Sequence, residues 1–161
     1  MRVLLLRHGE AVDTRSAPTD HDRWLTDIGR ETVTKVGKAL TRLDLHYSCI
    51  YTSPLVRAVQ TAEILAATHP GFRGPLEVHP ALSSEVGSTA QALEPLEHAA
   101  DDDLVVMVTH MPKVSVLAGQ LCRLPTFPSF RTSSACLLSI EGRKGRFQWV
   151  LDPETLELKR P

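Results

Sequence analysis

Two uninterrupted apolar runs, Val3–Leu6 and Leu104–Val108, constrain the fold of this chain most strongly. Neither run shows the alternation of apolar and polar residues that is typical of a strand with one face in water. Strands that are covered on both faces are characteristic of the parallel sheets of α/β proteins. We therefore predict that both runs are central strands of a sheet that helices cover on both sides.

The rest of the chain alternates between strand-like and helix-like segments. Further apolar segments predict strands at Cys49–Thr52, Leu76–His79, Ala135–Ile140 and Phe147–Leu151. Apolar residues spaced by three and four predict helices over Val33–Leu43, Leu55–Ala66 and Val114–Leu121. This order predicts a three-layer α/β/α fold with a mainly parallel central sheet, formed by residues 1–161 as one domain.

Charge and hydropathy exclude several classes of partner. The formal net charge is −1, so no strong overall field attracts the chain to nucleic acid or to acidic membranes. Only four apolar residues separate Arg2 from Arg7, which is too few for a secretory or membrane-spanning segment. We therefore expect a cytoplasmic protein without nucleic-acid or membrane partners. It is expected to be a monomer, because no amphipathic stretch is left over to demand a dimer.

Charged and histidine side chains follow three of the predicted strands. The first strand leads into Arg7, His8 and Gly9, the second into a helix whose first turn holds Arg57, and the central strand into His110. Ligands of open α/β sheets bind beyond the carboxyl ends of the strands. The sequence therefore predicts that two arginines and two histidines converge at one edge of the sheet.

Arg57 lies in the first turn of its predicted helix, where the helix dipole disfavours a cation. None of the residues three or four positions away is acidic, so we expect nothing nearby to neutralise it except a bound anion. The alternative is a solvated surface arginine. His8 could likewise be a structural histidine, although Gly9 would let the backbone approach a ligand closely or take a left-handed turn. The loop residues Asp20, His21 and Asp22 could border the same pocket or simply form a polar loop.

Four segments together carry a resemblance to a known family. They are Leu4–Glu10 (LLLRHGE), Leu25–Gly29 (LTDIG), Tyr51–Ala62 (YTSPLVRAVQTA) and Val108–Pro112 (VTHMP). In this order they resemble the histidine phosphatase superfamily, whose fold is phosphoglycerate mutase-like. The short chain and the segment Thr132–Ala135 most resemble its SixA-type phosphohistidine phosphatase branch.

The resemblance implies a role for each motif residue. His8 matches the family's phosphorylated nucleophile, and Arg7, Arg57 and His110 match its phosphate pocket. We include the neighbouring Gly9 and Met111 among the expected phosphate-binding residues. The forked guanidinium groups of two arginines suit the negative charge that spreads over the oxygen atoms of a phosphoryl group during its transfer.

The expected chemistry needs no metal or other cofactor. Zinc binding by histidines such as His8, His21 and His110 is disfavoured, because their spacing matches no HExxH or CxxC pattern.

The proton donor is expected at Glu85. Family members that cleave phosphate esters place an acidic residue after the third strand, and Glu85 is the nearest candidate. Its alternative is an exposed loop carboxylate. An imidazole leaving group, with a pKa near 6.5, would make a strong general acid much less important.

The sequence thus predicts a metal-independent phosphatase for phosphohistidine on a partner protein, such as a phosphorelay or phosphotransferase component. The long lid insertions of the sugar-phosphate members are missing, so we expect an open pocket. Two alternatives remain. One is a small-molecule phosphomonoesterase of the same superfamily, and the other is a non-catalytic module that binds phosphate or a phosphoprotein.

Overall fold

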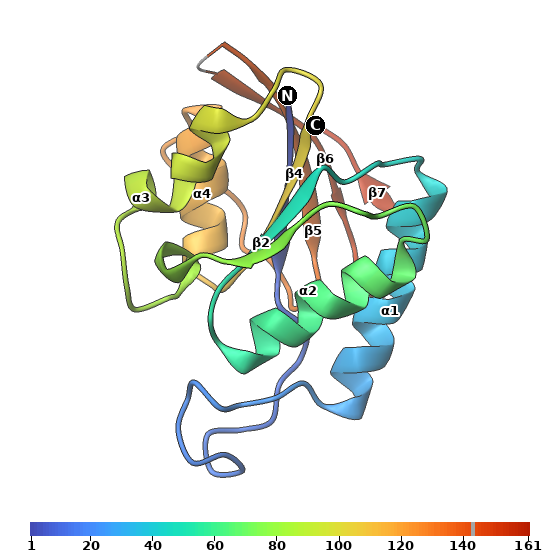
Figure 1. Ribbon diagram of the computed structural model, residues 1–161, viewed down its shortest axis with the longest axis vertical. Coiled ribbons are helices and arrows are strands. Elements are labelled where there is room, and N and C mark those ends of the chain that lie inside the picture. The colour runs from blue at the N-terminus through green and yellow to red at the C-terminus, as the bar shows by residue number, and fades with distance from the viewer. Residues whose placement is uncertain (143) are drawn as a thin grey trace.

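A seven-stranded sheet forms the centre of the computed structural model, which describes residues 1–142 and 144–161 (Figure 1). The strands are β1 Arg2–Arg7, β2 Cys49–Thr52, β3 Leu76–Val78, β4 Leu104–Thr109, β5 Ala135–Glu141, β6 Lys144–Leu151 and β7 Leu158–Lys159. Their order in the sheet is β3-β2-β4-β1-β5-β6-β7. The two long apolar runs are therefore the central strands β1 and β4, as predicted, and the structure shows that they are neighbours.

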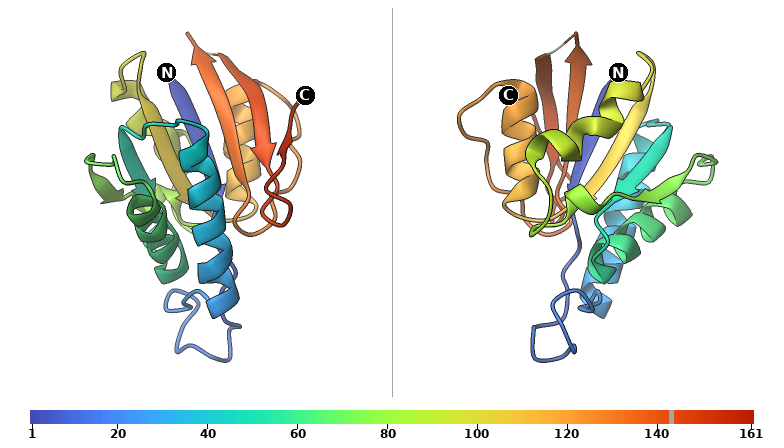
Figure 2. Two further views of the ribbon diagram at one scale, coloured as in Figure 1. Left: turned by 90° about the vertical axis from the view of Figure 1, so that its right-hand side faces the viewer. Right: turned by 60° about the vertical axis from the view of Figure 1, so that its left-hand side comes forward.

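Helices cover both faces of this sheet (Figure 2). They are α1 Asp27–Arg42, α2 Val56–Thr68, the short α3 Thr89–Leu93 and α4 Lys113–Cys122, with 3-10 turns η1 Pro80–Leu82 and η2 Glu94–His98. The helices α1 and α2 pack on one face, and α3 and α4 on the other. The three-layer prediction is confirmed.

The alternation of side chains in β1 divides the core into two clusters. Leu4 and Leu6 pack with apolar residues of α1 and α2, whereas Val3 and Leu5 pack with those of α3 and α4. All four side chains are completely buried. Each contributes roughly 1.5–3 kcal/mol by leaving water, so the core holds the end of β1 firmly in place.

The parallel part of the sheet consists of β3, β2, β4 and β1. The strands β5, β6 and β7 extend it in antiparallel pairs, which the alternation of strands and helices does not predict. The predicted third strand ends one residue earlier than expected, at Val78, and the predicted sixth is the second half of the longer β6. No helix among the described residues is both long and apolar enough to span a membrane.

Candidate active site

The strands β1 and β4 deliver two histidines to the same point. Their parallel register pairs Arg7 with Thr109, so His8 and His110 follow side by side. The His8 amide donates to the Thr109 carbonyl oxygen at 3.0 Å. The two imidazole rings have centroids 4.8 Å apart and planes inclined by 54°. Both side chains are almost entirely buried.

The hydrogen bond of His8 determines where its ring carries the proton. Nδ1 lies 2.7 Å from the carbonyl oxygen of Gly9, which can only accept, so Nδ1 carries the hydrogen and Nε2 a lone pair. Burial, followed by the charges of Arg57 and Arg7, lowers the pKa of His8 to about 4. At neutral pH the ring is therefore uncharged, with Nε2 available as a nucleophile.

Arg7 is held from the side of β5. Its Nη1 donates to the carbonyl oxygen of Phe130 at 2.7 Å, and its own carbonyl oxygen accepts from the Ser133 amide at 3.1 Å. Burial lowers the pKa of the guanidinium, which remains charged at neutral pH. The remaining guanidinium nitrogens leave Arg7 free to contact a further group.

Arg57 lies in the first turn of α2, where only 5% of it is exposed. Its Nη1 donates to the carbonyl oxygen of Asp20 at 2.6 Å, and its Nη2 lies 2.9 Å from the Asp20 carboxylate. The expectation that nothing nearby neutralises Arg57 was therefore wrong. The partner comes from a loop 37 positions earlier in the chain, which helical spacing cannot show.

The Asp20 carboxylate bridges Arg57 and a third arginine, Arg23. The Arg23 Nη1 lies 2.8 Å from Oδ1 of Asp20, and its Nε donates to the Val12 carbonyl oxygen at 2.7 Å. Hydrogen bonds from Arg23 and then Arg57 lower the pKa of Asp20. The Asp20 carboxylate, an anion of the chain itself, thus binds Arg57, which was expected to bind an anion from outside.

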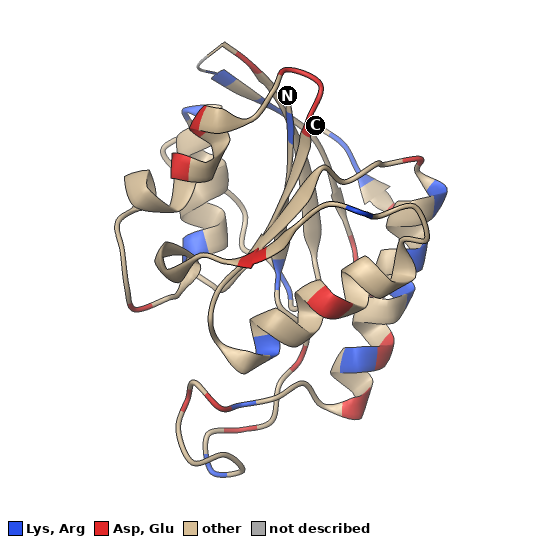
Figure 3. Cartoon of the chain, in the orientation of Figure 1, with Lys and Arg blue, Asp and Glu red and all other residues tan. Residues whose placement is uncertain are grey.

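The loop between β1 and α1 encloses the site more than the short chain predicts. It protrudes from the end of the sheet where β1 ends, and it carries both acidic and basic residues (Figures 1 and 3). The His21 carbonyl oxygen accepts from the Val56 amide at 3.1 Å, which fixes the loop against the start of α2. The expected open pocket is therefore wrong for His8, which is only 8% exposed.

Three polar atoms of the candidate site are buried without a hydrogen-bond partner among the described residues. They are Nε of Arg7, Nε of Arg57 and Nδ1 of His110. Buried polar atoms are nearly always paired in folded proteins, so unpaired ones need an explanation. A bound anion with several oxygen atoms would supply acceptors for such groups.

Gly9 and Met111 have structural roles beside the phosphate contacts that were predicted for them. The Gly9 amide donates to Thr61 Oγ1 at 3.1 Å, and a Cβ at Gly9 would lie 2.7 Å from Val33 Cγ2. Close packing against α1 therefore explains the glycine, and its backbone is not left-handed. Met111 packs against the α4 side of the core, and its Sδ accepts from Ser115 Oγ at 3.3 Å. Phosphate binding by either residue stays a prediction.

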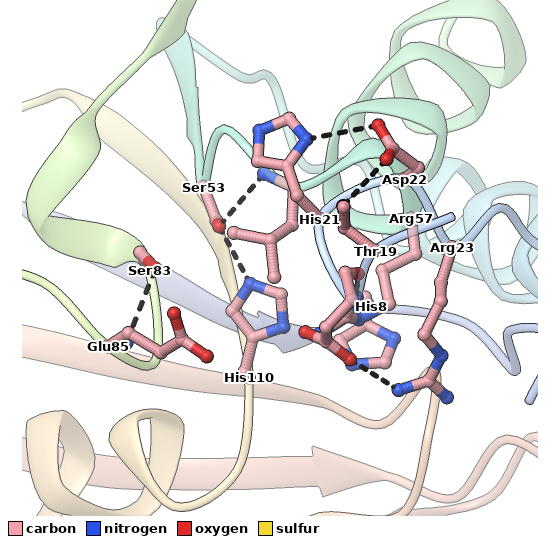
Figure 4. Close-up of polar contacts among 12 residues, drawn as sticks. His8, Thr19, His21, Asp22, Arg23, Ser53, Arg57, Ser83, Glu85 and His110 are labelled. Atoms are coloured by element: carbon pink, nitrogen blue, oxygen red, sulfur yellow. Dashed lines mark hydrogen bonds and ion pairs between the residues drawn. The ribbon is translucent and has the colours of Figure 1, made fainter. Parts of the chain in front are cut away.

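Glu85 borders a cavity of about 180 Å³ beside the site. The walls are formed by Asp20, His21, Pro54, Leu55, Pro80, Ser83, Glu85 and Val86. The Glu85 amide donates to Ser83 Oγ at 3.3 Å, and Figure 4 shows its carboxylate on the side that faces His110. Asp20 and His21 line this cavity, whereas Asp22, the two arginines and the two histidines of the site do not. The described residues hold no group of three His, Cys, Asp or Glu side chains that could bind a metal ion.

Sequence reasoning missed two contributors to the site besides Arg23. Thr61 Oγ1 donates to the Arg57 carbonyl oxygen at 2.7 Å while accepting from Gly9, so it connects α2 to the end of β1. Ser53 Oγ lies 2.7 Å from Nε2 of His110. The spacing of Thr61, one turn after Arg57, could have revealed its position, but no local pattern marks the contact of Ser53 with a residue 57 positions away.

Comparisons with known proteins agree with this arrangement. Residues 3–87 match the family described as histidine phosphatase superfamily (branch 1). An uncharacterized protein of Picosynechococcus is 34% identical over 100% of this chain and 97% of its own length. The phosphohistidine phosphatase SixA of Escherichia coli is 28% identical, with 99% of each chain covered. A solved structure of the protein histidine phosphatase SixA with tungstate has a TM-score of 0.85 at 29% identity, and covers 98% of this chain and all of that one.

Proposed function

This chain is a phosphatase that belongs to the histidine phosphatase superfamily, in its SixA-type branch, and we propose that it hydrolyses phosphohistidine on a partner protein. The reaction would pass through a covalent phosphohistidine on its own His8. The partner would be a component of a phosphorelay or phosphotransferase system.

One observation carries the proposed chemistry. A neutral imidazole with a free Nε2 lies beside buried polar atoms of Arg7, Arg57 and His110 that have no partner among the described residues. A phosphoryl group presents three oxygen atoms to such donors while its phosphorus faces the nucleophile. The arginines would therefore stabilise the negative charge that the transition state spreads over those oxygens.

In the first step, Nε2 of His8 attacks phosphorus as the bond between phosphorus and the substrate's ring nitrogen breaks. The hydrogen stays on Nδ1, which donates it to the Gly9 carbonyl oxygen, so the phosphorylated His8 ring carries a formal positive charge beside the phosphoryl oxygens. If the other nitrogen of the substrate ring carries a proton, the ring leaves as neutral imidazole. Glu85 is then not needed as a proton donor.

In the second step, water attacks the phosphorus of phosphorylated His8. The bond to Nε2 breaks, the electron pair returns to the ring, and the proton of water passes to solvent. Inorganic phosphate leaves with His8 restored to its neutral form, in which Nδ1–H donates to the Gly9 carbonyl oxygen. The same donors from Arg7, Arg57 and His110 would serve both steps, since both transfer one phosphoryl group.

Similarity supports phosphohistidine as the substrate. The name of the Escherichia coli relative is phosphohistidine phosphatase, and its similarity extends over nearly all of both chains.

A second candidate is a small-molecule phosphomonoesterase, which the position of Glu85 favours. Its carboxylate borders the cavity beside the two histidines, where it could protonate an alkoxide leaving group.

Parallel assays of two substrates test the proposal. We expect the protein to release phosphate from a phosphohistidine protein, and Glu85→Gln to leave that rate within about twofold while it lowers hydrolysis of a phosphate ester roughly 100-fold. Glu97→Gln, at an exposed position in η2, is the control. Ester hydrolysis without phosphohistidine hydrolysis would support the phosphomonoesterase instead. Binding of phosphate without turnover of either substrate would contradict both enzymes.

A further inference from the structure

Ser53 is a completely buried hydroxyl at the end of β2, directly beside His110 (Figure 4). Its Oγ lies 2.7 Å from Nε2 of the histidine. The backbone holds it firmly, because the Ser53 amide donates to the Val108 carbonyl oxygen at 3.0 Å. Two neighbouring strands, β2 and β4, therefore fix both partners of this contact.

The hydrogen bonds of Ser53 indicate which atom donates. Its Oγ accepts from the Leu55 amide at 3.3 Å, and its own hydrogen needs an acceptor. If Nε2 of His110 carried the ring proton, the Ser53 hydrogen would lack an acceptor among the described residues in a fully buried position. If Ser53 donates to Nε2 instead, its hydroxyl both donates and accepts a hydrogen bond, and fewer buried polar atoms are left unpaired.

Donation by Ser53 leaves the ring hydrogen of neutral His110 on Nδ1. Burial is the main cause that lowers the pKa of His110 to about 3, so the ring holds a single hydrogen at neutral pH. Nδ1 is buried without a partner among the described residues, and Figure 4 shows it on the side of the ring toward His8 and Arg57. A neutral N–H donor thus points to the place where the phosphoryl group would bind.

We propose that Ser53 is a positioning residue that holds His110 in the Nδ1–H tautomer, so that this N–H donates to a phosphoryl oxygen in the transition state. The tautomer follows from the hydrogen bonds alone, whereas the donation to a phosphoryl oxygen rests on the proposed function. Ser53 itself contacts no substrate in this arrangement.

The tautomer can be read directly from the ring nitrogen signals of His110 in two-dimensional ¹⁵N NMR of the full chain. In the wild type, we expect Nδ1 to be the protonated nitrogen. In Ser53→Ala, we expect a population with hydrogen on Nε2, because the donor that reserves this nitrogen as an acceptor is gone. A wild-type signal with hydrogen on Nε2 would overturn the proposal, even if the variant failed to fold.

A control variant separates this effect from loss of a serine hydroxyl beside β2. Ser48 lies just before β2 and is partly buried, and its Oγ accepts from the Leu104 amide at 3.2 Å, as Ser53 Oγ accepts from Leu55. Ser48→Ala removes a comparable bond at the opposite end of the strand, and should leave the His110 tautomer unchanged. A change in both variants would show a general structural effect and contradict the proposal.

Kinetics provide the second readout. Ser53→Ala should lower kcat about tenfold to 100-fold, the usual effect of losing an outer hydrogen bond that orients a histidine, with KM within about twofold. Unchanged kcat in a variant whose tautomer has shifted would refute the role of Nδ1–H in the reaction. If the wild type has no phosphatase activity, the proposed function fails, while the NMR result still decides the tautomer.

Discussion

Arg57 combines two functions that substitution can separate, positive charge and forked geometry. It already makes two contacts with Asp20, at 2.6 and 2.9 Å, and a phosphoryl group would compete for the same fork. A lysine would retain the charge but present a single donor centre. The site therefore depends on the identity of this residue as well as on its charge.

We predict that Arg57→Ala lowers kcat/KM by a factor of about 10 to 100 or more, because each charge-assisted hydrogen bond contributes about 1.5–3 kcal/mol. Arg57→Lys should recover only part of this loss. Steady-state release of phosphate from a phosphohistidine protein measures both, with the exposed Arg30→Ala in α1 as the control. An Arg57→Ala rate within twofold of wild type would remove Arg57 from the phosphate pocket.

The loop between β1 and α1 places the Asp20 carboxylate against Arg57, where the incoming phosphoryl group would bind. Asp20 binds both Arg57 and Arg23, so an external anion must displace it or share its partners. Its side chain is 39% exposed, so the free energy of this competition is reduced by solvent.

We predict that Asp20→Asn binds inorganic phosphate about fivefold more tightly, which corresponds to roughly 1 kcal/mol of removed competition and repulsion. Titration calorimetry measures this affinity. Asp22→Asn is the matched control, because Asp22 accepts from Thr19 Oγ1 at 2.6 Å and, among the described residues, makes no hydrogen bond or ion pair with Arg57. Weaker binding by Asp20→Asn would show that the carboxylate positions Arg57 for phosphate rather than competing with it.

The sequence predicts the elements better than the contacts between them. The apolar runs of β1 and β4 are sufficient to predict two central strands, and the residues after them predict that His8 and His110 meet at one edge, but that the two strands are neighbours comes from the structure. The pairing of Asp20 with Arg57 was not predictable, because a loop without periodic pattern determines it. The antiparallel pairing of β5 was likewise missed, since strand periodicity does not encode the direction of neighbouring strands.

For the molecule as a whole, the two buried histidines make stability depend on pH. Their usual pKa of 6.5 is lowered in the folded state, mainly by burial, to about 4 for His8 and about 3 for His110. At pH values between 6.5 and these lowered pKa values, the histidines of the unfolded chain bind protons that those of the folded protein do not. Their contribution to stability is therefore fully present above pH 6.5, and is lost progressively as the pH falls toward 4 and 3.

We predict that the free energy of unfolding falls between pH 7 and pH 5 by about 2 kcal/mol for each of these histidines, since one pKa unit corresponds to about 1.4 kcal/mol. Urea unfolding at the two pH values measures the change. His8→Asn should lose about half of this pH dependence. An unchanged dependence in His8→Asn would contradict the burial of a neutral His8.

If His8 is the nucleophile, its phosphorylated form must exist during turnover and can be trapped. The protein is mixed with a ³²P-labelled phosphohistidine protein, quenched in alkali after short times and mapped by peptide digestion. We predict acid-labile label on the peptide that contains His8, released phosphate at later times, and neither in His8→Ala. Released phosphate without label at His8, or turnover by His8→Ala at the wild-type rate, would contradict a covalent role for His8.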